Sequence, residues 1–245
     1  MSLASLKTGL HTAVNFTKTP PSVQTDLVDL TLTYTPNLIN ENDKTIKSRF
    51  PIFDTSFQNS TVNNNRSISP NDPTKVLTPA IINADHTECL YMKMESNPAD
   101  NDCMLLYLAT GAGIEIRKVV TSDVVRISWL QSGFTDINGF TLGFWHQLVI
   151  RHTSATPLVE WWLDGIKDAS TLTPDQTASG TFTTFWMNGS VGGSFGTQGG
   201  LGARYFWTRG LDNDEIEIDL PGALYDGNNF IKEDTLVKRI LLGLV

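Results

Sequence analysis

Apolar and polar residues alternate most regularly between positions 144 and 163. The segment 144–151 divides into two alternating sets, as the two faces of a strand do. One set is Trp145, Gln147, Val149 and Arg151, and the other is Phe144, His146, Leu148 and Ile150. This period of two predicts a strand with one buried face. Positions 152–157 are a turn-rich break, and the apolar segment Leu158–Leu163 predicts a second strand. The pair Asp164-Gly165 that follows is typical of a turn. Together these patterns predict two adjacent strands joined by a polar turn.

Shorter stretches of the same character follow one another along the rest of the chain, separated by residues that favour turns. We expect strands at 26–35, 88–95, 103–109, 113–120, 124–130, 181–187 and 203–208. The segment 36–80 is rich in Asn, Ser and Pro, and is expected to form long loops with short strands at 50–53 and 76–77. Short strands at fairly regular spacing indicate an all-β protein, an antiparallel β-sandwich of the jelly-roll type.

The two ends of the chain differ from this strand-rich middle, residues 23–229. Residues 1–22 are polar and Thr-rich, which predicts an extended N-terminal arm that rests on its own domain or on a neighbouring subunit. Residues 230–245 form an apolar tail with helical spacing. We expect a short C-terminal helical tail that is covered by the sandwich or by a partner subunit.

The last expected strand runs into a segment with two competing interpretations. If a helix begins there, Asp212 is its N-cap and Glu215 the third helical residue, a D-x-x-E capping box that turns Ile216 towards the core. If the sequence EIEID is a strand instead, Glu215, Glu217 and Asp219 share one face, and two of them are candidates for the acid and the nucleophile of a retaining glycosidase. The capping interpretation is favoured.

Four segments follow one another in a recognisable order: Trp145-His146, the sequence WLDG at 162–165, the Gly-rich run 189–202, and the stretch 209–216. In this order they resemble the closing half of a laminin G-like domain of the concanavalin A-like lectin/glucanase superfamily. The resemblance covers roughly residues 80–220 and implies a β-sandwich fold. Because the superfamily includes lectins, glycosidases, adhesion modules and structural proteins, the resemblance implies no single activity.

The glycosidases of this superfamily provide a direct comparison for the carboxylates. Laminarinase-type hydrolases carry theirs on a central strand, with a pattern close to E-I-D-x-x-E. Here the sequence EIEID differs in order and spacing, and lies after the Gly-rich run. This departure argues against hydrolysis, and we expect no catalytic residues and no enzyme activity.

Laminin G-like domains often bind calcium through loop oxygens, so the resemblance makes calcium the one cofactor to consider. Asp136, Asn138 and Asp164 are the candidate ligands, because they are oxygen donors in expected turns. A turn function explains Asp164 equally simply, and no D-x-D-x-D-G sequence is present. The four histidines lack the spacing of metal ligands, and we expect no other cofactor.

Six tryptophans raise the possibility of a carbohydrate site, since exposed indoles stack on sugar rings. Trp161 and Trp162 are neighbours on one expected strand and point to opposite faces, so at least one is expected to point outward. Trp186 and Asn188 lie beside an expected loop rim. The candidate ligand-binding residues are therefore Trp161, Trp186 and Asn188, with core packing as the alternative for the indoles.

The two cysteines, Cys89 and Cys103, are expected to be small buried hydrophobic residues, and they could lie on neighbouring strands because each opens one of two successive expected strands. A disulfide needs a specific Cβ geometry, so the sequence leaves their pairing open.

Charge and segment content narrow the choice of partners. The formal net charge is −8 and no basic patch is present, which argues against nucleic acid as a partner. The sequence has no apolar stretch of the length of a membrane span and no signal-peptide-like apolar region near its start. We therefore expect synthesis in a cytoplasm and a place in a virion, with a cytoplasmic protein or one released by lysis as the alternative.

These expectations favour a non-enzymatic structural or adhesion module. By analogy with phage surface proteins, we expect a decoration, capsid-associated or tail protein whose partners are other copies of itself or other virion proteins. The first alternative is a carbohydrate-binding module that recognises cell-surface polysaccharide, and the second is a glycoside hydrolase. Cell-surface glycans are possible partners under either of the first two functions.

Overall fold

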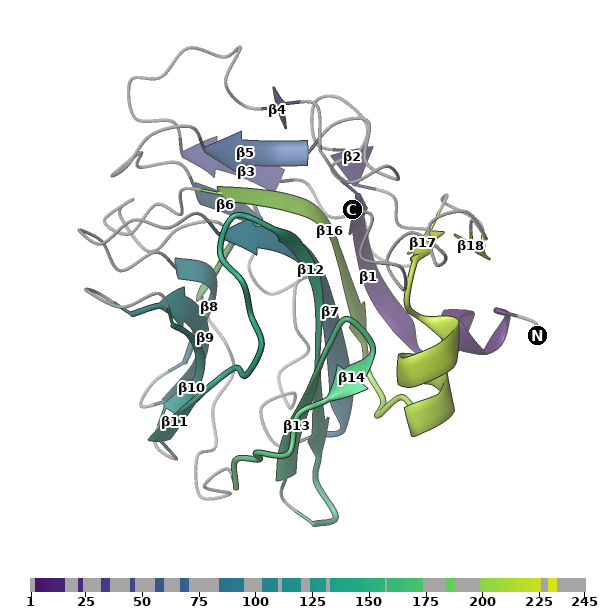
Figure 1. Cartoon of the computed structure of the whole chain (residues 1–245). Coiled ribbons are helices and arrows are strands. Elements are labelled where there is room, and N and C mark those ends of the chain that lie inside the picture. The colour runs from purple at the N-terminus through teal and green to yellow at the C-terminus, as the bar shows by residue number, and fades with distance from the viewer. Residues whose placement is uncertain are drawn as a thin grey trace.

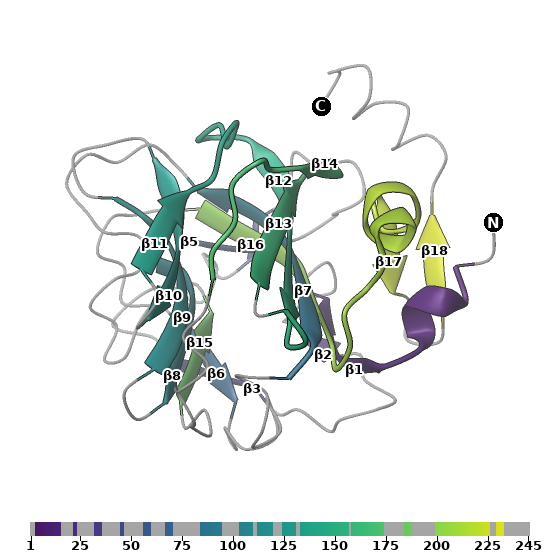
Figure 2. The same ribbon diagram turned by 90° about the horizontal axis from the view of Figure 1, so that it is seen from below.

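The computed structural model describes the sheets, the helical turns and most of their connections. The described residues are 3–15, 22–23, 32–35, 45–46, 56–59, 67–70, 84–94, 103–109, 112–119, 124–130, 133–156, 158–173, 184–187, 199–225 and 229–232. They form two facing antiparallel sheets and a smaller covering layer, seen side by side in Figure 2. The expected all-β antiparallel sandwich is therefore confirmed.

The first sheet, sheet A, lies between the other two layers. Its strand order is β14-β13-β12-β7-β16-β1-β2, and β5 also pairs with β16 and carries β4 (Figure 1). The bounds are β14 Ile166–Lys167, β13 Leu158–Leu163, β12 Trp145–Thr153, β7 His86–Met94, β16 Gly199–Trp207, β1 Leu10–Asn15, β2 Ser22–Val23, β5 Ser56–Asn59 and β4 Thr45–Ile46. The predicted pair of strands around a polar turn is β12 and β13, which pair antiparallel.

Sheet B faces one side of sheet A and has the order β11-β10-β9-β8-β15-β6-β3. The bounds are β11 Gly133–Asp136, β10 Val125–Leu130, β9 Ala112–Lys118, β8 Cys103–Ala109, β15 Thr184–Met187, β6 Ser67–Pro70 and β3 Leu32–Thr35. The strands predicted at 103–109, 113–120 and 124–130 correspond to β8, β9 and β10 within two residues at each end.

The outer layer covers the other side of sheet A and is built from both ends of the described chain. It comprises the 3₁₀ turn η1 (Ser5–Lys7), the π-helical turn η6 (Glu215–Asp219) and the hairpin of β17 (Ala223–Tyr225) with β18 (Phe230–Lys232). Figure 2 shows these elements side by side on the far side of sheet A from sheet B. Three layers therefore replace the two of a simple sandwich.

A single apolar cluster joins the outer layer to sheet A. Its buried members are Leu6, Leu10, Ala13, Cys89, Tyr91, Trp145, Val149, Trp162, Ala203, Tyr205, Trp207, Leu211, Ile216, Leu220, Ala223, Tyr225 and Phe230. We call this set the outer core. Burial of an aromatic or aliphatic side chain of this size contributes roughly 1.5–3 kcal/mol.

Buried hydrogen bonds reinforce the same contact. The Gln147 side-chain amide donates to the Tyr91 hydroxyl at 2.7 Å and to the Leu220 carbonyl at 3.0 Å, so both of its N–H groups are used in linking β7 and β12 to the outer layer.

The expectation of one buried face on the β12 strand is wrong. All six residues from Trp145 to Ile150 are buried, and so are all nine residues of β7. Both strands lie in the interior of sheet A, where sheet B covers one face and the outer layer covers the other. Amphipathic alternation is lost because neither face meets water.

Residues 3–15 of the expected N-terminal arm rest on their own domain, one of the two alternatives, but they are a part of its core. Leu6, Leu10 and Ala13 are buried in the outer core, and β1 pairs antiparallel with β16. Hydrophobic burial and a sheet ladder make this segment a part of the domain. The rest of the expected arm lies outside the described residues except for Ser22, which begins β2.

The expected helical tail at 230–245 is a strand where it is described, because Phe230–Lys232 forms β18. Residues 233–245, which carry the helical spacing, lie outside the described residues. Short strands expected at 50–53 and 76–77 also lie outside them.

The two cysteines lie in different sheets, which corrects the expectation of neighbouring strands. Cys89 is in β7 of sheet A and Cys103 opens β8 of sheet B. Cys89 is a free, fully buried thiol, as expected of a small hydrophobic residue, and burial raises its pKa well above the ordinary value.

Candidate functional site

A pocket opens beside the β13–β14 hairpin at one edge of sheet A. Its volume is about 420 Å³, and it is lined by Asn138, Gly139, Leu163, Asp164, Ile166, Lys167, Asp168 and Ala169. We call this the turn pocket. Small-ligand sites of proteins are hollows of this order of size with a few positioned polar groups.

The hairpin forms because Asp164 and Gly165 supply the conformation that a two-residue turn requires. Their φ angles are 53° and 81°, both in the left-handed region that a type I′ turn needs at its central positions. A Cβ atom on Gly165 would lie 3.0 Å from the Pro221 side chain, so glycine also allows the turn to pack against the segment after η6. The predicted Asp164-Gly165 turn is confirmed.

The Asp164 carboxylate is fixed by two neighbours on β12. Its Oδ1 accepts the backbone N–H of Gln147 at 2.8 Å, and its Oδ2 lies 2.7 Å from Nδ1 of His146. Nε2 of His146 lies 3.1 Å from the backbone nitrogen of Thr141 and 3.0 Å from its carbonyl oxygen. Phe140 packs on the same ring at a centroid distance of 4.4 Å. These contacts hold one wall of the turn pocket in a single arrangement.

A second carboxylate is fixed on the opposite wall. Asp168 accepts the backbone N–H of Asn138 at 3.0 Å, its Nδ2 at 3.0 Å, and the backbone N–H of Ser170 at 2.8 Å. Burial alone would raise the pKa of Asp168, but the hydrogen bonds from Ser170 and Asn138 outweigh it and hold the pKa below the ordinary value. Asp168 therefore remains a carboxylate and ties the β11–β12 connection to the hairpin.

The one cationic residue of the lining directs its charge away from the pocket. Lys167 pairs with Trp162 across the hairpin, whereas Ile166 pairs with Leu163, so the two pairs lie on opposite faces. The Lys167 ammonium lies 2.5 Å from Glu160 and 5.3 Å from the Trp162 ring centroid, on the outer-core face.

Two of the three predicted calcium ligands, Asn138 and Asp164, meet in the turn pocket. The third, Asp136, lies on β11, where its carboxylate pairs with Arg126 at 2.9 Å. Within the described ranges, no group of three or more His, Cys, Asp or Glu side chains is placed to hold a metal ion. Calcium binding by the three residues together therefore gains no support from their geometry.

The predicted carbohydrate-stacking residues do not assemble. Trp161 and Trp162 are both fully buried, so the expectation that one of them points outward is wrong. The physical reason is the third layer: Trp162 packs in the outer core, and Trp161 points to the opposite, sheet B side. Trp186 lies on β15, and Asn188 falls outside the described residues.

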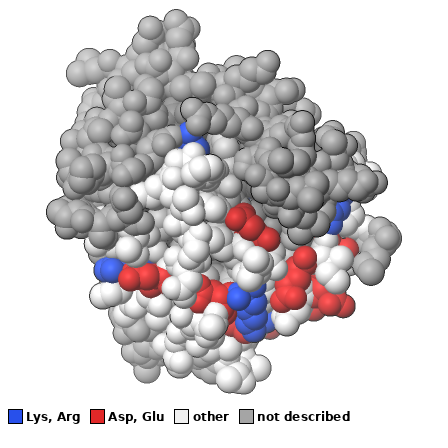
Figure 3. All heavy atoms as spheres, viewed as in Figure 1, with Lys and Arg blue, Asp and Glu red and all other residues white. Residues whose placement is uncertain are grey.

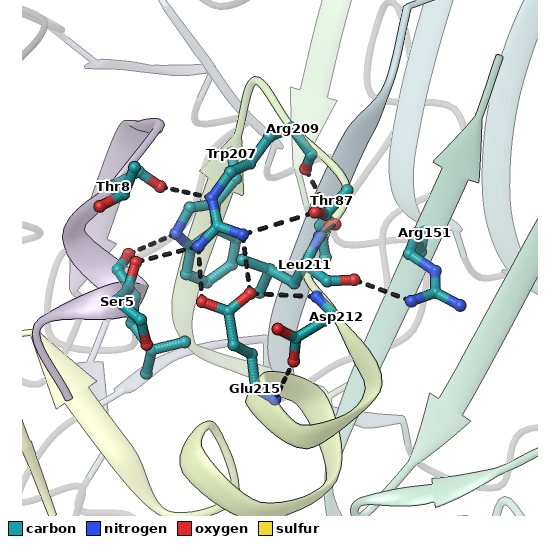
Figure 4. Close-up of polar contacts among 11 residues, drawn as sticks. Ser5, Thr8, Thr87, Arg151, Trp207, Arg209, Leu211, Asp212 and Glu215 are labelled. Carbon is teal, nitrogen blue, oxygen red and sulfur yellow. Dashed lines mark hydrogen bonds and ion pairs between the residues drawn. The ribbon is translucent and has the colours of Figure 1, made fainter. Parts of the chain in front are cut away.

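The predicted capping box is confirmed. The N–H of Glu215 donates to Oδ1 of Asp212 at 2.8 Å, and the N–H of Asp212 donates to Oε2 of Glu215 at 3.0 Å (Figure 4). Ile216 is fully buried, as expected. The alternative of a strand with three carboxylates on one face is wrong, because these residues form the helical turn η6.

Arg209 occupies the Glu215 carboxylate further. Its NH1 and NH2 groups each lie 2.7 Å from a Glu215 oxygen, and it also donates to the carbonyls of Ser5, Thr8 and Gly210 (Figure 4). Burial alone would raise the pKa of Glu215, but the hydrogen bonds from Arg209 and Asp212 outweigh it and lower the pKa. Glu217 accepts the indole N–H of Trp162 at 2.9 Å. Two of the three candidate glycosidase carboxylates therefore have structural partners.

Sequence reasoning missed Gly139, Ile166, Lys167 and Asp168. A signal was present in the sequence DGIKD, because an Asp-Gly turn directly after an apolar strand predicts a hairpin that continues through the next residues. The contact between this edge and Asn138 joins residues 30 positions apart, and local pattern does not reveal it.

The fold is similar to several solved structures. A botulinum neurotoxin type C structure, from a toxin whose uptake depends on two ganglioside molecules, matches with a TM-score of 0.65 and 9% identity over 89% of this chain and 52% of that chain. The binding domain of botulinum neurotoxin DC in complex with SialylT gives 0.60 and 9%, over 87% and 51%. Trypanosoma rangeli sialidase in complex with sialic acid gives 0.58 and 11%, over 85% and 32%.

These likenesses establish the β-sandwich fold and nothing finer, because the identities are so low. The chain spans about half the length of the neurotoxin chains and about a third of the sialidase chain. No protein-family model and no curated protein sequence matches the chain. The laminin G-like assignment therefore stays a prediction. Among the described residues, no helix is long and apolar enough to cross a membrane.

Proposed function

We propose that this protein is a non-enzymatic attachment module that binds carbohydrate in the turn pocket. The observation that carries the proposal is the pocket itself, in which fixed hydrogen-bonding side chains lie beside an exposed apolar one. Asp164, Asp168 and Asn138 supply the polar groups, and Ile166, which is 74% exposed, supplies the apolar surface.

Sugars match this combination of groups. Their hydroxyls form directional hydrogen bonds with side-chain oxygens, and their C–H faces pack on apolar side chains. Because Asp164 and Asp168 are already held by backbone N–H groups, binding costs little side-chain entropy. A preorganised site of this kind favours recognition of a defined ring.

A binding function fits the described carboxylates better than hydrolysis does. Glu215 forms the capping box and the pair with Arg209, and Glu217 bonds to Trp162. A retaining glycosidase needs one carboxylate free to attack and another free to donate a proton, which these contacts oppose. The similar folds include binding domains of botulinum neurotoxins, one of them in complex with SialylT, and this supports a binding function here.

The proposal includes a place on a virion surface, with attachment to cell-surface glycans as the function. Its support is the analogy of a lectin-like sandwich with phage surface proteins. Mass spectrometry of purified particles checks the location, and a light-scattering mass of the isolated protein checks self-association. Absence from the particles would remove this part of the proposal and leave carbohydrate binding in place.

A glycan panel tests the binding function. We expect saturable binding to at least one class of polysaccharide without chain cleavage in the same wells. Ala169→Met places a larger side chain in the turn pocket and should abolish that binding. The matched control is Ala155→Met, which adds the same side chain at the exposed β12–β13 turn outside the pocket. Equal loss in both variants, or no binding by the parent protein, would refute the proposal.

A further inference from the structure

We infer that the turn pocket selects neutral or amino sugars and rejects glycans that end in an anionic sugar such as sialic acid. The inference rests on the proposed function and names the ligand class of the same site. The structural basis is that the pocket offers hydrogen-bond acceptors and negative charge, with no free cation among its lining residues to meet a ligand carboxylate.

The first step is the inventory of hydrogen-bonding atoms. Asp164 and Asp168 are acceptors only, because each carboxylate already receives N–H donors and has none to give. One N–H of the Asn138 side-chain amide donates to Asp168 at 3.0 Å, so Asn138 offers a ligand its carbonyl oxygen as an acceptor and a single remaining N–H as a donor. A ligand that donates, through hydroxyl or ammonium hydrogens, therefore fits this site.

The second step is the sign of the charge. Two of the eight described lining residues are carboxylates, and Lys167 is the only cation among these eight. Because Lys167 shares the face of Trp162 and pairs with Glu160, its charge is compensated on the other side of the hairpin. A sialic acid carboxylate placed in the pocket would meet two like charges without a paired cation, which is strongly unfavourable.

Acidic side chains also occur elsewhere on the described surface. Figure 3, viewed as in Figure 1, shows Asp and Glu side chains in a band across the lower part of the described surface, with a few Lys and Arg among them. The whole sequence has a formal net charge of −8. Long-range electrostatics therefore act against anionic glycans in the same direction as the pocket.

The experiment compares three probes on the full chain in a buffer with a metal chelator. They are a neutral oligosaccharide, the same oligosaccharide with a terminal sialic acid, and a deacetylated amino-sugar oligomer. We expect the sialylated probe to bind at least about tenfold more weakly than its neutral counterpart. The amino-sugar oligomer should bind at least as well as its acetylated form, because its ammonium groups are donors with positive charge.

The variant Asp164→Asn tests whether the Asp164 carboxylate causes the weaker binding of the sialylated probe. Asn tolerates positive φ angles, and its amide oxygen can still accept the Gln147 N–H, so the hairpin is expected to remain intact. The variant should reduce the discrimination against the sialylated probe several-fold. The matched control Asp136→Asn makes the same charge change on β11, outside the pocket, and should leave the discrimination unchanged.

Salt provides a second readout that needs no variant. Raising NaCl to about 1 M shortens the Debye length to about 3 Å, so discrimination that arises from charge should shrink. Sialylated probes that bind as well as neutral ones overturn the inference and leave the proposed function standing. Discrimination that survives both high salt and Asp164→Asn also overturns it. If no probe binds, the proposed function fails and the inference fails with it.

Discussion

Arg209 joins two parts of the chain that are far apart in sequence, the region of η6 and the N-terminal segment. Its guanidinium forms a two-pronged pair with Glu215, and it also donates to the carbonyls of Ser5 and Thr8 in the N-terminal segment. A planar guanidinium can satisfy several acceptors at fixed angles, which a lysine cannot do. One side chain thus fixes η1 against η6.

Substituting Glu215 tests whether this carboxylate is structural. Glu215→Gln removes one partner of a largely buried ion pair and leaves Arg209 with weaker acceptors. We expect the free energy of unfolding, measured by urea titration, to fall by about 1–3 kcal/mol while glycan binding is unchanged.

The exposed first-turn variant Asp214→Asn is the control and should change stability by less than about 0.5 kcal/mol. A Glu215→Gln protein with parental stability that has lost a polysaccharide-cleaving activity would contradict the structural role.

At the residue scale, hydrogen bonds between residues close in sequence could be predicted from the sequence. The capping box of Asp212 and Glu215 was predictable because both partners lie within four residues and the motif satisfies its own N–H groups. The burial of Trp161 was not, since it depends on layers built from distant parts of the chain. Alternation along a strand says which residues share a face and does not say whether water reaches that face.

The positions of strands in the sequence could be predicted, but the neighbours of each strand in the sheets could not. β8 and β13 match the expected bounds 103–109 and 158–163, because apolar, β-branched and aromatic runs between turn residues are strong local signals. The partners of each strand follow from long-range pairing, such as β16 with β7 and β1. Cys89 and Cys103 lie on two strands that follow one another in the sequence. Because these strands pair with distant partners, the two cysteines lie in separate sheets.

Histidines lie between the two sheets, where a sandwich normally has apolar side chains. The ring of His152 stacks on His86 at a centroid distance of 5.2 Å and on Trp129 of β10 at 5.4 Å. His152 is fully buried, and its Nδ1 lies 2.8 Å from the Ala84 carbonyl. Burial lowers the pKa of His152, although the Ala84 hydrogen bond and the Asp85 charge act in the opposite direction.

The contact between sheets should therefore weaken in mild acid. In the unfolded chain His152 takes up a proton near its ordinary pKa of about 6.5, and in the folded chain only at lower pH. Between these values the unfolded state binds more protons, so stability rises with pH and falls as the pH drops below about 6.5. Burial lowers the pKa of His11 as well, with Arg204 contributing, which adds to the same slope.

Urea titrations at a series of pH values between neutral and about 5 measure this slope. His152→Gln removes one titrating group and should flatten it. Identical slopes for the parent and the variant would show that His152 does not contribute.

At the scale of the whole molecule, the first and the last described segments pack together on sheet A. The N-terminal segment and the C-terminal hairpin lie side by side on sheet A in both views (Figures 1 and 2), and both contribute to the outer core. The Trp207 indole donates to the Leu6 carbonyl at 2.6 Å. Residues near the two ends therefore complete one core, which composition and local pattern did not reveal.

Leu6→Ala tests this closure. Leu6 is fully buried, so the substitution removes apolar burial and leaves a cavity, and the free energy of unfolding should fall by about 2–5 kcal/mol. Lys7→Ala is the matched control in the same turn, because Lys7 is exposed and its loss should cost less than about 0.5 kcal/mol. Equal stability of the two variants in urea titration would show that residues 3–15 do not contribute to the core.

The reactivity of the free Cys89 thiol reports how often the outer layer opens. Only a thiolate reacts with alkylating reagents or oxidants, and this sulfur is shielded by the outer core with its pKa raised. Its rate of modification is therefore set by how often the covering layer lifts from sheet A. The same shielding keeps this sulfur reduced in an oxidising medium for as long as the layer stays closed.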